Sequence, residues 1–168
     1  NTLSPYVRTR AGRGILCCCS GGGPAEPCDP QNDPDFLPGH DVMRSQVCKM
    51  VADAAGINDP VPTTQQTFTD LPVSNPFWVW VERLAGRGSI NGYTCGGVGE
   101  PCDPLNRPYF RPFANVTRGQ LAKIVSSTVP YNQVNPTAQQ TFTDVLPGRT
   151  FWIWIERGHL HGRSRGPT

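Results

Sequence analysis

The sequence has no long hydrophobic run: no stretch approaches the roughly 20 apolar residues that a helix needs to cross a bilayer. It also has no block of lysine and arginine residues interleaved with aromatic ones, a pattern typical of nucleic-acid-binding surfaces. The 15 basic and 13 acidic residues are mixed along the chain and leave a net charge of +2. We therefore expect no transmembrane segment and no nucleic-acid partner.

An initiator methionine and a signal peptide are also absent, since the sequence opens at Asn1 within a recurring pattern. Seven cysteines are many for 168 residues, and most lie in loops rich in glycine and proline, which favours disulfide bonds in an oxidising compartment. An odd number leaves at least one thiol unpaired or paired with another chain. We expect an extracellular protein, here as a processed or partial chain whose export signal lies elsewhere.

Glycine and proline contribute 18 residues each, so helices should be short and loops long. Four Trp, four Tyr and seven Phe nevertheless provide enough aromatic area for several compact cores. This composition differs from that of a disordered chain.

An internal repeat organises the chain. A shift of 74 residues aligns the sequence with itself without a gap. The shift places residues 26–30 (Glu-Pro-Cys-Asp-Pro) on 100–104, residues 65–70 (Gln-Gln-Thr-Phe-Thr-Asp) on 139–144, and Phe77-Trp78 on Phe151-Trp152. Agreement of this length excludes chance and predicts tandem copies of one supersecondary unit.

Two helices are predicted in each copy, and the clearer one begins after Thr117. Thr117 can serve as its N-cap, with Gln120 three residues later completing a capping box. The corresponding helix of the earlier copy spans residues 43–55. There Met43 stands at the cap position, and Asp41 offers an alternative cap one step upstream.

The other helix is predicted to begin at Phe77, because Phe77, Val81 and Leu84 share one helical face. Its aromatic and β-branched residues make a strand equally compatible with local propensity. Asp70 and its counterpart Asp144 precede the two copies of this segment. We expect these aspartates to cap or brace the helix starts.

A long loop rich in glycine and proline separates the two helices of a copy. Cys95 and Cys102 lie at the two ends of its glycine-rich part, so a disulfide between them could close the loop. A bridge between Cys19 and Cys28 is the matching choice in the earlier copy. Cys48 aligns with an alanine on a helix, and we expect it to be a small packed side chain without a bridge.

Several short motifs follow one another in a characteristic order. They are Phe68-Thr69-Asp70, Phe77-Trp78, Glu82-Arg83-Leu84, residues 88–93 (Gly-Ser-Ile-Asn-Gly-Tyr), Phe110-Arg111-Pro112 and Thr117-Arg118-Gly119-Gln120. Their order resembles that of the S-layer homology (SLH) family. The family usually has an acidic residue where Gln46 and Gln120 stand here, and its units are shorter because they lack the cysteine-bracketed loop.

The resemblance implies a mainly α fold of tandem two-helix SLH-like repeats, with long Gly/Pro/Cys loops and little or no sheet. The expected units are a partial repeat at 1–56 with its second helix at 43–55, a linker at 57–66, a complete repeat at 67–129, a linker at 130–140, and a partial repeat at 141–168 that holds a first helix.

The resemblance also implies that grooves between units bind cell-wall polysaccharide, often through an anionic pyruvyl ketal. The implied ligand-binding residues are Arg44, Arg118, Trp78, Trp152 and Gly92, together with Thr117 and Gln120 of the Thr-Arg motif. A guanidinium group can bind a carboxylate in bidentate fashion near a helix N-terminus. In the structural alternative, the arginine pairs with a protein carboxylate and the tryptophans belong to the core.

Other kinds of site have weaker support. The acidic loop from Asp29 to Asp35 offers oxygen ligands for calcium, but the matching loop has Arg107 and Tyr109 in place of two of them. Cys-x-x-C pairs and recurring histidines are missing, which argues against zinc. Asn115 opens a glycosylation sequon, although modification would compete with capping by Thr117. We predict no metal, no cofactor and no enzymatic activity.

Two functions follow from these expectations. The first is a non-catalytic cell-surface module that attaches an exported protein to the cell envelope by binding wall glycan. The alternative is a structural subunit that assembles head-to-tail into a surface layer or filament, because incomplete repeats leave apolar faces for neighbours to cover. The expected partner is therefore wall polysaccharide or further copies of the chain, as a homo-oligomer or polymer.

Overall fold

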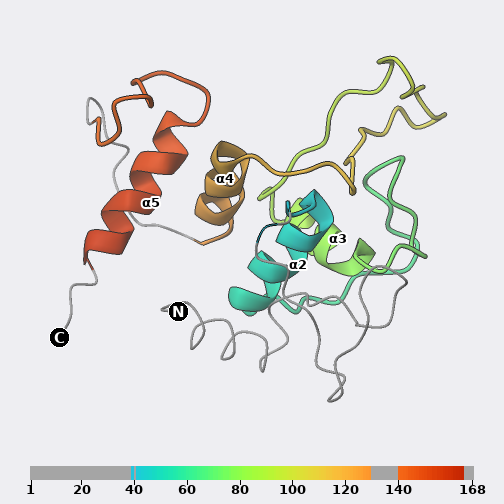
Figure 1. Ribbon diagram of the computed structural model, residues 1–168. Helices are drawn as coiled ribbons and strands as arrows, with labels where there is room; N and C mark the ends of the chain where they lie inside the picture. Colours follow the sequence, from blue (N-terminus) through green and yellow to red (C-terminus); the bar gives the residue numbers. More distant parts are fainter. Residues whose placement is uncertain (1–38, 40, 130–139, 165–168) are drawn as a thin grey trace, which may run out of the picture.

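The computed structural model describes residues 39, 41–129 and 140–164, with side chains up to His159 (Figure 1). This part of the chain contains four helices and no β-strand: α2 (Arg44–Ala54), α3 (Trp78–Gly86), α4 (Arg118–Thr128) and α5 (Trp152–Ser164). The mainly α fold class is therefore confirmed for the described residues. The tandem SLH-like architecture remains a prediction.

The ambiguous aromatic segment is a helix, α3, and its start is organised by Asn75. The Asn75 side-chain oxygen accepts a hydrogen bond from the Phe77 N–H at 2.9 Å, and the Asn75 carbonyl accepts one from the Trp78 N–H at 3.0 Å. Val81 and Leu84 are fully buried on one face, as predicted. Burial of this face favours the helix over a strand of equal local propensity.

The helix that follows Thr117 is capped as predicted. Thr117 Oγ1 accepts a hydrogen bond from the Gln120 N–H, and Gln120 Oε1 accepts one from the Thr117 N–H at 3.0 Å. At the start of α2 only the second half of this arrangement is present, from the Met43 N–H to Gln46 Oε1. Asp41 does not cap α2, because the N-cap is Met43 and the Asp41 carboxylate accepts a hydrogen bond from Asn115.

The helices pack in two pairs that the 74-residue shift relates. Helix α2 packs against α3, α4 packs against α5, and α2 also packs against α4 (Figure 1). The shift carries both ends of α2 onto those of α4, and the first residue of α3 onto that of α5. We call α2 and α3 the first pair, and α4 and α5 the second pair. The two helices of a pair are those joined by the shorter connection.

A buried glutamate organises each pair in the same way. Glu82 accepts hydrogen bonds from the N–H and the hydroxyl of Thr67, at 2.8 and 2.6 Å. Glu156 accepts the same two bonds from Thr141, at 2.8 and 2.7 Å. A buried carboxylate is costly unless it is hydrogen-bonded, so these contacts hold the connection onto its helix.

The core of the first pair is completed by a segment from outside the pair. Residues 107–116, which we call the covering segment, lie across α2 and the residues before α3. The Phe110 ring is fully buried and lies 5.2 Å from the ring of Phe68, centroid to centroid. Phe68, Leu71, Val81 and Leu84 are buried with it in one cluster.

Asp70 holds the covering segment and does not cap α3, so our expectation for this residue was wrong. Its two carboxylate oxygens accept hydrogen bonds from the N–H groups of Phe110 and Arg111, at 2.7 and 2.6 Å. Arg111 has a positive φ of 59°, a conformation that costs a residue with a side chain about 1–2 kcal/mol. The two bonds from Asp70 offset this cost.

Replacing Phe110 with alanine should lower the free energy of unfolding by about 3–5 kcal/mol, because the ring is fully buried. Phe113, which is 70% exposed in the same segment, is the matched control, and its replacement should change the value by less than about 0.5 kcal/mol. Chemical denaturation measures both. Equal effects of the two substitutions would contradict the assigned core.

Candidate functional site

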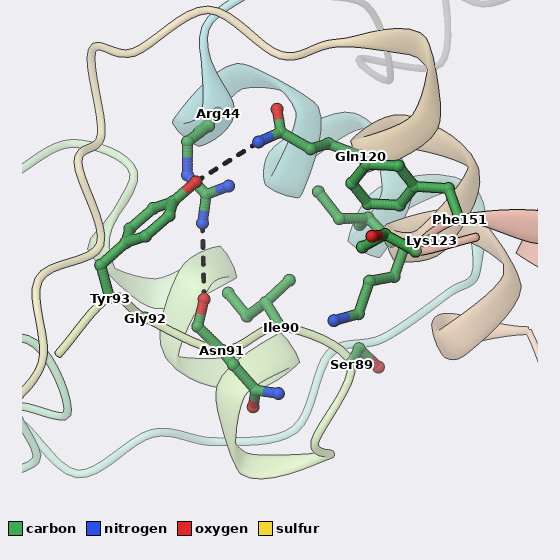
Figure 2. A pocket seen from close by; sticks show the side chains of 11 residues that line it. Arg44, Ser89, Ile90, Asn91, Gly92, Tyr93, Gln120, Lys123 and Phe151 are labelled. Carbon is green, nitrogen blue, oxygen red and sulfur yellow. Dashed lines mark hydrogen bonds between the residues drawn. The ribbon is translucent and has the colours of Figure 1, made fainter. Parts of the chain in front are cut away.

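A cavity of about 240 Å³ lies where the two helix pairs meet (Figure 2). One wall comes from the N-terminus of α2 and the loop after α3, and the other from α4 and the residues before α5. Its lining consists of Arg44, Ser89, Ile90, Asn91, Gly92, Tyr93, Gln120, Lys123, Ile124, Thr150 and Phe151. The cavity is thus a groove between the two helix pairs.

Arg44, the first residue of α2, is 6% exposed and is held in place from several sides. Its Nε donates to the Phe110 carbonyl at 2.9 Å, and an Nη atom lies 3.5 Å from the Asn91 carbonyl. The guanidinium carbon lies 5.2 Å from the centroid of the Tyr93 ring. The charge is therefore fixed in position at the edge of the groove (Figure 2).

The opposite wall supplies Gln120 and Lys123 from α4. Gln120 Nε2 donates to the Tyr93 hydroxyl at 3.3 Å, which ties α4 to the loop across the groove. Figure 2 shows the Lys123 ammonium directed toward the loop that carries Ile90 and Asn91. It makes no ion pair or hydrogen bond with the residues that the structure describes.

Lys49 is the counterpart of Lys123 in α2, and the two lysines differ in their partners. Its Nζ lies 2.7 Å from the Asp53 carboxylate one turn later and 4.8 Å from the centroid of the Trp80 ring. Ser127 replaces that aspartate in α4, so Lys123 lacks the corresponding carboxylate. The second copy thus keeps the lysine and frees its charge for the groove.

The groove has a positive character because Arg44 and Lys123 contribute to its lining and no aspartate or glutamate does. Tyr93 and Phe151 add aromatic surface, and Asn91, Gln120 and Ser89 add hydrogen-bonding groups. Pockets for drug-sized ligands measure about 300–1,000 Å³, so this cavity, at about 240 Å³, has room for a smaller ligand.

The groove brings together three of the residues that the resemblance implied: Arg44, Gly92 and Gln120. Trp78 and Trp152 do not join them, since they are 6% and 9% exposed and belong to their own helix pairs. Trp78 donates its indole N–H to the Gln65 carbonyl at 3.2 Å. The two tryptophans therefore match the structural alternative.

Arg118 and Thr117 also lie away from this groove. Thr117 is exposed and caps α4, whereas the exposed Arg118 lines a different cavity between α4 and α5. Arg118 makes no ion pair with a described carboxylate, although such a pair was the structural alternative for this residue.

Sequence reasoning missed Lys123, Tyr93 and Phe151 as groove residues. The signal for Lys123 was present, because the aligned copies keep the lysine and change its partner from Asp53 to Ser127. No comparable signal marks Phe151, whose ring reaches the groove because Gly119 leaves room on α4. A Cβ atom at Gly119 would lie 2.6 Å from the Phe151 ring.

Gly92 is required by close packing. A Cβ atom there would meet the Pro108 side chain at 2.7 Å, the Tyr109 carbonyl at 2.8 Å and the Phe68 ring at 2.9 Å. The Tyr93 N–H donates to the Tyr109 carbonyl, and the Tyr109 N–H donates to the Tyr93 carbonyl, each at 2.8 Å, so the two backbones lie side by side. Gly92 thus shapes the floor of the groove without contacting a ligand through a side chain.

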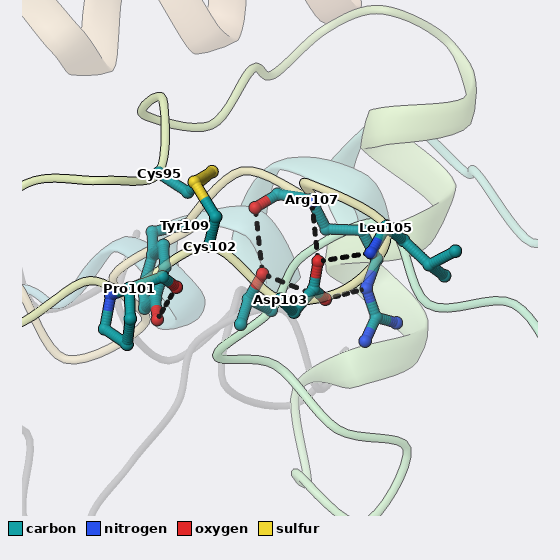
Figure 3. The surroundings of a disulfide bond; sticks show 8 residues. Cys95, Pro101, Cys102, Asp103, Leu105, Arg107 and Tyr109 are labelled. Atoms are coloured by element: carbon teal, nitrogen blue, oxygen red, sulfur yellow. Dashed lines mark hydrogen bonds and ion pairs between the residues drawn. A yellow bond between two sulfur atoms is a disulfide. The ribbon is translucent and has the colours of Figure 1, made fainter.

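The predicted disulfide between Cys95 and Cys102 is present and closes the loop after Tyr93 (Figure 3). The predicted Cys19–Cys28 bridge lies outside the described residues. Cys48 is a free thiol, fully buried in the core of the first pair, as its alignment with alanine predicted. Burial raises its pKa to about 12, so it is neither a nucleophile nor a metal ligand at neutral pH.

Two carboxylates, those of Asp103 and Glu100, brace the disulfide loop, and Figure 3 shows the first of them. Asp103 accepts hydrogen bonds from the N–H groups of Leu105 and Arg107 and pairs with the Arg107 guanidinium. These bonds, chiefly the one from the Arg107 backbone, lower the pKa of Asp103. Glu100 pairs in bidentate fashion with Arg111 at 2.7 and 2.8 Å, which lowers the pKa of this glutamate.

Asn115, the predicted glycosylation site, is exposed beside the N-terminus of α4. Its side-chain amide donates to the Asp41 carboxylate at 2.8 Å, and Met43 pairs with it in an isolated β-bridge. Glycosylation would modify the same nitrogen that donates to Asp41. Its occurrence remains a prediction.

No protein-family model matches the chain, and no curated protein sequence gives a significant match. Within residues 41–129 and 140–164, no helix combines the length and hydrophobicity needed to span a membrane. The same residues contain no group of three or more His, Cys, Asp or Glu side chains placed to hold a metal ion.

Substituting Gly92 with alanine should lower the free energy of unfolding by about 1–3 kcal/mol, because the new methyl group overlaps backbone and ring atoms. Gly86 is the control: a Cβ atom there meets nothing within 4 Å, and the residue ends α3. Its replacement by alanine should be neutral or slightly stabilising. Thermal unfolding of both variants measures the difference, and a neutral Gly92→Ala would refute the close contact.

Acid should loosen the disulfide loop at an unusually low pH. The ordinary pKa of Asp103 is 3.8 and folding lowers it, so its contribution to stability is present above 3.8 and is lost as the pH falls through the lower folded value. The amide NMR signals of Leu105 and Arg107 should therefore titrate below pH 3.8. Arg107→Gln should raise this midpoint. A wild-type midpoint at or above 3.8 would contradict the assignment.

Proposed function

We propose that this chain is a non-catalytic extracellular module that attaches an exported protein to the cell envelope by binding an anionic wall glycan. The groove between the helix pairs carries the proposal: it has two cationic side chains, Arg44 and Lys123, and no carboxylate in its lining. The resemblance to the SLH family suggests the class of ligand. The expectation of extracellular location rests on the cysteines.

The side chains of the groove suit one acidic sugar. A carboxylate such as that of a pyruvyl ketal would lie between the Arg44 guanidinium and the Lys123 ammonium, forming charge-assisted hydrogen bonds. Arg44 is already ordered by the Phe110 carbonyl, so binding requires little loss of side-chain entropy. The rings of Tyr93 and Phe151 would then contact the apolar face of the sugar.

The groove favours binding over catalysis. Its lining contains no histidine, cysteine, aspartate or glutamate that could act as a general acid, general base or strong nucleophile. A ligand held there would be retained unchanged, as an anchor requires.

Lys123→Gln should weaken binding of purified pyruvylated wall polysaccharide about tenfold, because one charge-assisted hydrogen bond contributes about 1.5 kcal/mol. Lys49→Gln is the matched control, since this lysine occupies the same helical position but pairs with Asp53. It should bind like the wild type. Isothermal titration calorimetry measures the affinities.

The same polysaccharide after removal of its ketal groups by mild acid tests the role of the charge. Wild-type protein should bind it more weakly than Lys123→Gln binds the intact polymer, because the contacts of both Arg44 and Lys123 with the carboxylate are lost. Equal affinity of the wild type and both variants for the intact glycan would exclude this groove as the binding site.

A further inference from the structure

A second groove lies between α4 and α5, and the 74-residue shift aligns residues of its lining with residues in and around the core of the first pair. It is a cavity of about 730 Å³ between the two helices of the second pair. Its lining includes Arg118, Leu121, Phe142 and Asp144, whose counterparts in the first pair are Arg44, Val47, Phe68 and Asp70. Val47 and Phe68 are 2% and 1% exposed, whereas Leu121 and Phe142 are 41% and 43% exposed. The corresponding positions are therefore buried in the first pair and exposed to solvent in the second pair.

In the first pair, the covering segment closes the core through side-chain and backbone contacts. The Phe110 ring packs on Phe68, and its N–H donates to Asp70. Its carbonyl accepts a hydrogen bond from Arg44 Nε. Two residues later, the Pro112 carbonyl accepts bonds from both the N–H and the hydroxyl of Ser45, at 3.1 and 2.8 Å.

The second pair retains the groups that would receive such a segment. Asp144 and Arg118 keep the acceptor and donor side chains of Asp70 and Arg44, and both are exposed. Neither makes a hydrogen bond or an ion pair with the described residues. Phe142 offers an aromatic ring at the position of Phe68 and contacts His159 edge to face. The receptor half of the interface is therefore complete and vacant among the described residues.

The sequence contains a second segment of the covering type. The 74-residue shift places Phe36 on Phe110 and Pro38 on Pro112, and both segments lead directly into a helix, α2 or α4. We propose that the Phe36–Pro38 segment of a second copy docks in the α4–α5 groove. Phe36 would then pack on Phe142, and Asp144 would bind the backbone N–H groups at 36 and 37.

The Phe36–Pro38 segment in this groove must come from a second molecule, because each segment of this type is continuous with the helix that follows it. In the first pair, the covering segment is hydrogen-bonded to Val42, Arg44 and Ser45, and α4 begins immediately after it. If a Phe36–Pro38 segment covers the second pair in the same way, the α2 that follows this segment must lie against the second pair as α4 lies against the first. The molecule's own α2 already packs against α3 and against α4. Repetition of one head-to-tail contact produces a chain of molecules.

The test uses sedimentation velocity of the full chain over a range of concentrations. Wild-type protein should form oligomers that lengthen with concentration. Phe36→Ala, which alters only the inserted side, and Asp144→Asn, which alters only the receptor, should each weaken self-association at least tenfold. Phe113→Ala, at an exposed position of the covering segment, should assemble like the wild type. Circular dichroism confirms that each variant is folded.

Mixing the two defective variants gives the sharper result. The Asp144→Asn protein retains an intact Phe36, and the Phe36→Ala protein retains an intact groove, so an equimolar mixture should form heterodimers that do not grow further. The proposal is overturned if the wild type stays monomeric at about 1 mM, where even weak specific interfaces associate. It is also overturned if both variants assemble like the wild type.

Discussion

The contact between Asp70 and the backbone of the covering segment is the constraint on which the rest of the structure depends. Two N–H groups, those of Phe110 and Arg111, donate to one carboxylate, and this places the Phe110 ring inside the first pair. The same segment positions the Phe110 carbonyl that orders Arg44, and it leads directly into α4. The core, the orientation of the guanidinium and the placement of the second pair therefore follow from one long-range interaction. Without it, the groove between the pairs would lose its fixed charge.

The sequence was sufficient to predict what depends on local or periodic patterns. The helix after Thr117 was predicted from its capping residues, the Cys95–Cys102 bridge from spacing, and the buried state of Cys48 from its alignment with alanine. These features require only neighbouring residues or the internal repeat. The mainly α class was implied by the resemblance, because the segment from Phe77 was equally compatible with a strand by local propensity.

The partners of side chains distant in sequence could not be predicted in this way. Asp70 stands before α3 and looks like a cap, yet its partners lie about 40 residues later, in the covering segment. For Trp78 both a sugar-binding role and a core role stayed open, because aromatic residues serve both purposes and its burial depends on how α2 and α3 pack. Lys123 became a site residue only through the loss of an aspartate one turn away. Each case depends on tertiary placement, which local propensity does not encode.

The buried thiol of Cys48 has a consequence for how the chain matures. Among the described cysteines, Cys48 is enclosed in the core as a free thiol, and Cys95 and Cys102 form the loop bridge. In an unfolded chain the Cys48 thiol is exposed and has its ordinary reactivity, so it competes in thiol–disulfide exchange. Packing of α2 against α3 removes that competitor. Burial of Cys48 therefore keeps this thiol from exchanging with the Cys95–Cys102 bridge in the folded chain.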